Sequence, residues 1–245
     1  MANTVKETGA NARRASDDYG DAPSRASYTL ERIRADILAA TLKPGQKLSF
    51  KMLTSMYQVG LSPLRESLCQ LVGNGLVMLE SQRGFRVTPV SREDLVDVIS
   101  IRRWVEVYAL ELSIDRRNEQ WSQEVKSALD EFTFVAAKAG DSRPINKDWQ
   151  EIHRKLHFAM ISACDSPTLL QFCSQIYDRF DRYRRLAVPA QAFMAATAGD
   201  HRAIARAALA GERNKAKLLL ERHIDDIAEI VNAKFTPDTA GDCKH

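Results

Sequence analysis

The stretch 62–89, which reads SPLRESLCQLVGNGLVMLESQRGFRVTP, limits the possible folds of this chain more than any other. Ser62 is expected to cap a helix, and Pro63 suits the first helical position, where its missing N–H would have no partner anyway. Leucines then recur at helical spacing until a Gly-Asn-Gly motif at 73–75 ends the helix. Two short runs typical of strands complete the stretch.

The two strand-like runs, 76–80 and 85–89, predict a hairpin with a basic tip. The turn between them carries Gln82, Arg83 and Gly84, and the glycine permits a tight backbone. A helix followed by such a hairpin is typical of a winged helix-turn-helix. In that fold the helix enters the major groove of DNA and the tip reaches a neighbouring groove.

Two helices are expected before this stretch, at 29–40 and 49–57, the second packed inward through Leu53 and Met56. Together with the helix and hairpin they give the segment 25–90 the size of one winged-helix domain. This segment holds nine Lys and Arg against four Asp and Glu, a net charge of +5. Such an excess is expected of a small DNA-binding module, although a solvated basic face would give the same count.

The composition is that of a globular protein, with 44% hydrophobic and 27% charged residues. No apolar run approaches the roughly 18 residues of a membrane helix, and the N-terminus lacks the apolar core of a signal peptide. We therefore expect a cytoplasmic protein without a membrane partner. Four widely spaced cysteines favour free thiols, with Cys69 and Cys173 in the core. The polar segments 1–24 and 235–245 are expected to be a disordered tail and a flexible tail.

The segment 91–234 contains only helical patterns and begins with Ser91 followed by acidic residues, a typical helix start. Helices are expected at about 91–114, 123–139, 149–166, 169–186, 191–210 and 212–233. Lengths near 20 residues and short connections predict an antiparallel helix bundle, with Trp104 and Trp149 in its core. The predicted fold is mainly α, a winged helix-turn-helix at 25–90 followed by this all-α bundle.

Four of the five histidines lie in the predicted bundle. His153 and His157 are four residues apart and share one helix face, while His201 and His223 lie on two later helices. Neutral imidazoles from facing helices are a common way to hold a transition metal within a bundle. One such pair alone is better explained as polar packing or as surface residues, but two further histidines favour a metal site.

The runs YTLERIRADILAATLKPGQKLS, SPLRESLCQLVGNGLV and QRGFRVTPV resemble the N-terminal domain of GntR-type bacterial transcription regulators. The runs IRRWVE, HRKLHFAMISACDSP, GDHRAI and LLLERHI resemble the ligand-sensing domain of the FadR-like (FCD) subfamily. The resemblance covers about residues 27–232 and is nearest to the carbon-starvation-induced regulator group. It implies a homodimer that binds double-stranded operator DNA and responds to a small carboxylate at a metal in the bundle. Between repression and activation we favour repression.

Two positions depart from the family pattern. Leu61 replaces the arginine that commonly reads a guanine, and Gly60 replaces the serine before it, so the usual operator is not expected. His153 stands where the family usually has an aspartate. A fourth neutral ligand should lower the affinity for hard ions such as Mg²⁺ and favour a divalent transition metal, with Zn²⁺ or Ni²⁺ as the best candidates.

The position on the recognition helix and the resemblance together indicate DNA contacts. Arg65 stands near the helix start, where side chains reach base edges, and Lys51 matches a family position that contacts the DNA backbone. Each also has an ordinary interpretation as a surface residue. The expected DNA-binding residues are Lys51, Ser62, Pro63, Arg65, Gln82, Arg83 and Gly84.

Arg102 matches the family arginine that lies near the effector. A metal with open positions and a guanidinium together suit a carboxylate, which can bind the ion and accept a bidentate hydrogen bond. Arg182 and Arg185 could face the same pocket. The alternative for Arg102 is a salt bridge, for example to Glu106.

Two other classes of function remain open at this point. A metalloenzyme with a His-rich bundle would need a general base beside the metal. The nearby carboxylates are Asp148 and Glu151, and Glu151 should face away because it is only two residues from His153. A purely structural metal, without an effector, is the other possibility.

Overall fold

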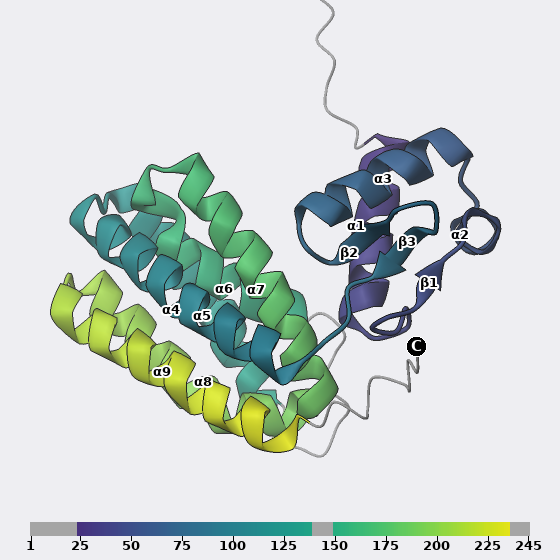
Figure 1. Cartoon of the computed structure of the whole chain (residues 1–245). Coiled ribbons are helices and arrows are strands. Elements are labelled where there is room, and N and C mark those ends of the chain that lie inside the picture. Colours follow the sequence, from purple (N-terminus) through teal and green to yellow (C-terminus); the bar gives the residue numbers. More distant parts are fainter. Residues whose placement is uncertain (1–23, 139–148, 236–245) are drawn as a thin grey trace, which may run out of the picture.

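The computed structural model of the protein describes residues 24–138 and 149–235. Within them the chain forms a small N-terminal domain and a larger helical domain (Figure 1). The two predicted tails and the helix break expected at 140–144 fall outside the described residues, apart from the edge residues 24 and 235. Among the residues that the structure describes, none of the helices combines the length and apolarity needed to cross a bilayer.

The N-terminal domain has the three helices and the hairpin that were predicted, and an additional short strand, β1 (Lys47–Leu48). The predicted elements are α1 (Arg25–Leu38), α2 (Phe50–Tyr57), α3 (Leu61–Gly73), β2 (Val77–Glu80) and β3 (Gly84–Val87). The antiparallel sheet has the order β1-β3-β2, with Lys47 opposite Arg86 and Val77 opposite Val87. Fully buried leucines and isoleucines from all three helices pack against this sheet and form a separate core.

The start of α3 differs from the prediction that Ser62 caps it. Gly60 is the N-cap residue, and it makes no side-chain hydrogen bond. Ser62 and Pro63 are therefore the second and third residues of the helix rather than its cap and first residue. Proline is tolerated there because the N–H groups of the first turn have no intrahelical acceptor. The exposed hydroxyl of Ser62 is thus not used by the helix start.

Two core assignments in this domain are wrong. Met56 is 40% exposed, because the inward face of α2 is formed by Leu53 and Tyr57, which lie one turn apart. Cys69 is exposed because it follows Leu68, which takes the inward position on α3. Cys173, by contrast, is buried as predicted.

The C-terminal domain is a bundle of long helices, which confirms the mainly α prediction. They are α4 (Arg92–Asp115), α5 (Glu119–Lys138), α6 (Trp149–Ile161), α7 (Pro167–Ala187), α8 (Ala190–Leu209) and α9 (Arg213–Lys234), with a short 3-10 helix, η2 (Ser162–Cys164), after α6. Helix α4 packs against α7 and α9, and α5 packs against α6 and α8. Trp149 is buried as predicted, but Trp104 is 81% exposed because Arg102 and Glu106 take the inward positions on α4.

The two domains meet along α7 (Figure 1). Arg34 of α1 donates hydrogen bonds of 2.5 and 2.6 Å to the two carboxylate oxygens of Asp178. Arg154 of α6 donates to the same carboxylate at 2.5 Å. Nearby, Arg182 of α7 donates a hydrogen bond of 2.8 Å to the carbonyl oxygen of Thr88, which lies in the linker between β3 and α4. One buried carboxylate therefore joins a helix of the winged domain to two helices of the bundle.

Replacement of Asp178 by Asn should leave two guanidinium groups without their counter-charge. Asp178 is only 4% exposed, and removing one partner of a buried ion pair typically costs about 3–5 kcal/mol. Urea titration of Asp178→Asn should show such a loss in the free energy of unfolding. Glu31→Gln is the matched control, because Glu31 contacts Arg34 at the surface and its loss should cost less than about 1 kcal/mol. Equal losses in the two variants would contradict this role of Asp178.

Candidate metal and effector site

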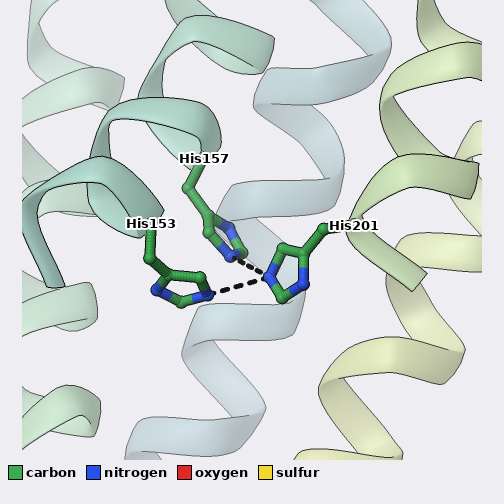
Figure 2. A group of neighbouring side chains, drawn as sticks. All are labelled: His153, His157 and His201. Carbon is green, nitrogen blue, oxygen red and sulfur yellow. Dashed lines mark hydrogen bonds between the residues drawn. The ribbon is translucent and has the colours of Figure 1, made fainter. Parts of the chain in front are cut away.

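Three histidine side chains converge inside the bundle (Figure 2). His153 and His157 lie one turn apart on α6, and His201 faces them from α8. The Nε2 atom of His201 lies 2.8 Å from Nε2 of His153 and 3.0 Å from Nε2 of His157. The three ligand atoms lie within 4.8 Å of one another, a spacing that one metal ion can bridge.

Contacts on the far side of the rings orient them for this purpose. The Nδ1 atom of His201 lies 2.7 Å from the Thr197 carbonyl oxygen, which can only accept a hydrogen bond. Nδ1 therefore carries the proton, and Nε2 keeps the lone pair that binds a metal. The Tyr177 hydroxyl lies 2.8 Å from Nδ1 of His153 and can accept a hydrogen bond from it in the same way.

His223 of α9 lies beside these three residues. Its ring centroid is 4.3 Å from that of His201, and its Nδ1 lies 3.4 Å from a carboxylate oxygen of Asp200. Its Nε2 is buried and has no hydrogen-bond partner. Buried polar atoms normally have partners, so an orphan nitrogen beside three converging imidazoles is the signature of a site for a further group. Three of the four residues predicted as ligands thus lie close enough to share one metal ion, with His223 beside them, and imidazole is a suitable donor for a transition metal.

The surroundings keep the imidazoles neutral. Desolvation, and secondly the neighbouring imidazoles, hold the pKa values of His153, His157 and His201 well below the usual range. Desolvation also lowers the pKa of His223, although its contact with Asp200 opposes the shift. Aromatic rings, including Trp149 with its centroid 5.0 Å from that of His153, complete an apolar shell. Metal binding requires neutral imidazole, so this environment favours it.

Arg102, the predicted effector residue, lies next to the histidines and already has a partner. Its Nε donates to Glu106 Oε1 at 2.8 Å and its Nη2 to Oε2 at 3.3 Å, so the salt bridge considered as an alternative is formed. The guanidinium lies 4.5 Å from the ring centroid of Phe180 and 5.4 Å from that of Tyr177. Burial alone would lower the pKa of Arg102, but the Glu106 carboxylate outweighs it and raises this pKa.

Arg182 faces the domain junction rather than the histidine group, contrary to expectation, and Arg185 is paired with Asp181. Arg182 donates to the linker carbonyl groups, and Arg185 donates to Asp181 at 2.6 Å. Helix α7 turns Tyr177 toward the histidines, and a residue five positions later points roughly 140° away around the helix axis. This geometry directs Arg182 to the domain junction.

Sequence reasoning missed two neighbours of the histidines. Asp200 directly precedes His201 in the GDHRAI motif, which is a signal that could have been used. Tyr177 has no such signal, because its contact with His153 depends on how α6 and α7 pack. As predicted, Glu151 is exposed rather than aimed at the histidines. Asp148 lies outside the described residues.

The predicted DNA-binding residues lie on α2, α3 and the β2–β3 turn. Arg65 is exposed on α3, and its guanidinium carbon lies 5.4 Å from the ring centroid of Phe50. Leu61, the first residue of α3, is 63% exposed. The remaining exposed candidates are Lys51, Ser62, Gln82 and Arg83, whereas Pro63 and Gly84 are partly buried. At the wing tip Gln82 has a φ of 61° and Gly84 a φ of 87°, so two residues rather than one adopt the left-handed conformation.

Comparison with known proteins identifies both domains. Residues 26–87 match the family described as "Bacterial regulatory proteins, gntR family", and residues 97–226 match the FCD domain. The chain belongs to the GntR family of transcription regulators with an FCD domain. The family predicted from the sequence motifs is thereby confirmed, as is the fold class.

Individual relatives agree with this assignment. The uncharacterized HTH-type transcriptional regulator BphR of Paraburkholderia xenovorans is 33% identical over 204 residues, 83% of each chain. The HTH-type transcriptional repressor GlaR of Escherichia coli is 29% identical over 196 residues, 78% of this chain and 89% of GlaR. The structure of E. coli McbR/YncC has the same fold, with a TM-score of 0.73 and 18% identity over 88% of this chain and 100% of that one. The protein is thus a DNA-binding transcription regulator and not an enzyme, which sets the metalloenzyme alternative aside.

The lowered histidine pKa values predict that acid destabilises the metal-free protein. A group whose pKa is lower in the folded state binds more protons when unfolded, so the free energy of unfolding rises with pH. Its contribution is present above the unfolded pKa of about 6.5 and is lost as the pH falls below that value. Between pH 7 and pH 5 each buried imidazole should contribute a slope of up to about 1.4 kcal/mol per pH unit.

Urea titrations in the presence of a chelator, at several pH values, would measure this slope. His201→Gln should reduce this slope by the contribution of one proton, because the variant removes one of the fully buried rings. A free energy of unfolding that stays constant from pH 7 to pH 5 would show that the rings are not held neutral.

Proposed function

We propose that this regulator is a metal-dependent repressor that binds operator DNA as a homodimer and responds to a small carboxylate. The observation that carries the proposal is the convergence of the Nε2 atoms of His153, His157 and His201, with the orphan Nε2 of His223 beside them. Repression is favoured by the similarity to the repressor GlaR.

The donor set determines which metal and which ligand suit the site. Imidazole favours Zn²⁺ or Ni²⁺ over hard ions such as Mg²⁺. Four neutral ligands leave the full double charge of the ion uncompensated within the bundle, and burying such a charge is costly without an anion. Arg102 next to the histidines is already balanced by Glu106, so the charge of the ion is what an anion would compensate. A small carboxylate is therefore the effector class that the residues favour.

In the winged domain α3 would enter the major groove, with Arg65 near base edges and Ser62 near a phosphate. Lys51 at the start of α2 and the wing residues Gln82 and Arg83 would contact the DNA backbone and an adjacent groove. Leu61 presents an apolar side chain where the family commonly has an arginine, so the operator should differ from the usual one at the base pair it faces.

A homodimer would use the outer face of α4. Val96, Trp104 and Tyr108 are 53%, 81% and 56% exposed, and they recur at helical spacing on this face. Large exposed apolar patches of this kind mark protein interfaces. A groove of about 690 Å³ beside Trp104 and Tyr108 is also lined by Arg103 and Glu221, which could pair with their counterparts in a second copy. Two copies would present two winged domains to two half-sites of an operator.

The route from the site to DNA would run through neighbouring residues on two helices. On α6, His153 precedes Arg154, and on α7, Tyr177 precedes Asp178. Tyr177 contacts His153, while Asp178 contacts both Arg154 and Arg34 of the winged domain. A shift of α6 against α7 on ligand binding would therefore reach α1. For regulation the ligand must bind the two arrangements with affinities that differ, typically by about 1–3 kcal/mol.

The metal proposal predicts about one equivalent of Zn²⁺ or Ni²⁺ per chain in protein prepared without chelators. His157→Ala should lose most of this metal and melt at a lower temperature, because metal binding stabilises the folded state. Elemental analysis would measure the content. Lys155→Ala, an exposed position on the same helix, should keep its metal. Failure of the wild-type protein to take up either ion would contradict the proposal.

The DNA proposal predicts that Arg65→Ala weakens binding to a selected operator by about 1–3 kcal/mol. Lys126→Ala, exposed on α5, should bind as the wild type does. For six or more phosphate contacts, affinity should fall by about 10³ or more between 50 and 200 mM salt. Fluorescence anisotropy with an operator selected from random duplexes would measure both effects. An Arg65→Ala variant with unchanged operator affinity would remove Arg65 from the DNA contacts.

A further inference from the structure

The carboxylate of Glu106 occupies the Nε–Nη2 edge of Arg102, one of the two edges on which a guanidinium can bind a carboxylate through both oxygens. It binds Arg102 through both oxygens, at 2.8 and 3.3 Å, with the bidentate pairing that a guanidinium offers to any carboxylate. Both side chains are buried, at 2% and 4% exposure, and the rings of Tyr177 and Phe180 lie close to the guanidinium. Arg102 therefore has an internal ligand of the same chemical class as its proposed effector.

The space around Glu106 is nearly filled. The adjoining cavity, which Glu106, His157 and Tyr177 line together with apolar residues, has a volume of about 10 Å³. That volume is about the minimum for a single water molecule, so it cannot hold an organic acid. A carboxylate can take the Nε–Nη2 edge of Arg102 only if the Glu106 side chain moves.

A second hydrogen-bond donor lies close to Glu106. Its Oε2 is 3.9 Å from Nδ1 of His157, beyond a hydrogen bond but within reach of a small side-chain rotation. When Nε2 of His157 binds a metal, Nδ1 must carry the proton, and a carboxylate is the usual partner for the Nδ1–H of a metal-bound histidine. Metal loading therefore gives Glu106 a second hydrogen-bond donor, which competes with Arg102 for its Oε2 atom.

We infer that Glu106 is an internal competitor of the effector, and that a carboxylate ligand enters the site by displacing Glu106 from Arg102 toward His157. This inference rests on the proposed function and adds the mode of regulation. It also concerns specificity, because a neutral molecule that displaced Glu106 would leave the buried Arg102 without its charged partner. With a divalent metal, Arg102 and Glu106 together, a dicarboxylate dianion would bring the group to zero net charge.

The test uses acetate, the simplest probe of this exchange, and the zinc-loaded full-length chain. Glu106→Ala removes the competitor and leaves space for the probe. Calorimetric titration should show that acetate binds Glu106→Ala at least about tenfold more tightly than wild type, which corresponds to one lost charge-assisted contact of the competitor. Acetamide, which has the shape of acetate without its charge, should bind neither protein detectably.

Glu111→Gln is the matched control. Glu111 lies on the same helix, five residues from Glu106, but faces Arg213 and Lys217 near the surface. Its acetate affinity should equal that of the wild type. Arg102→Met should abolish acetate binding in the Glu106→Ala background.

The outcomes separate the inference from the function on which it rests. If both proteins hold zinc and acetate binds them with affinities within twofold, the competitor role of Glu106 is wrong and the proposed function stands. If neither protein holds zinc or binds acetate, the inference and the proposed function are both wrong. Should Glu106→Ala fold poorly, its refolding yield is compared in acetate and in chloride at equal ionic strength. The inference predicts a higher yield in acetate. A yield independent of acetate overturns the inference, and so does tight binding of acetamide.

Discussion

The structure depends on a single buried carboxylate, that of Asp178, which lies between Arg34 and Arg154. A charge that is removed from water is tolerated only with close counter-charges and hydrogen bonds, and two guanidiniums supply both. Each arginine comes from a different helix, so satisfying Asp178 fixes α1, α6 and α7 relative to one another. The orientation of the DNA-binding domain is thus set by the requirement to neutralise a charge inside the bundle.

The histidine group shares α6 with this ion-pair group, and Tyr177 of α7 contacts it. His153 and Tyr177 each stand one residue before a member of the ion-pair group, and the two layers share the packing of α6 on α7. One layer consists of neutral imidazoles suited to a metal, while the other is charged and joins the domains. Because protein interiors are closely packed, a change of a few tenths of an ångström in one layer is felt in the other.

Much of this could be predicted from the sequence, because periodicity reports which face of its own helix a residue occupies. The winged helix, the bundle and the shared face of His153 and His157 follow from such spacing. Periodicity does not report which neighbouring helix that face meets. Packing between helices decides that Arg182 faces the linker and that Trp104 faces solvent, so both were misplaced. It also decides that Tyr177 meets His153, so this contact was missed. The start of α3 was misjudged for a local reason, because Gly60 and Ser62 are both residue types that favour a cap.

The junction between the domains also limits how modular this protein is. The contacts that receive the winged domain lie within two turns of α7, where Gln175 donates to Asn74, Asp178 accepts from Arg34 and Arg182 donates to Thr88. In a chimera that joined this winged domain to the helical domain of another regulator, α7 would lack those groups. Arg34 would then lose its buried counter-charge. Recombination between relatives would preserve the junction only if the crossover carried α1, the linker and this part of α7 together. The two domains are separate in sequence, but the contacts between them must be exchanged together if their stability is to be kept.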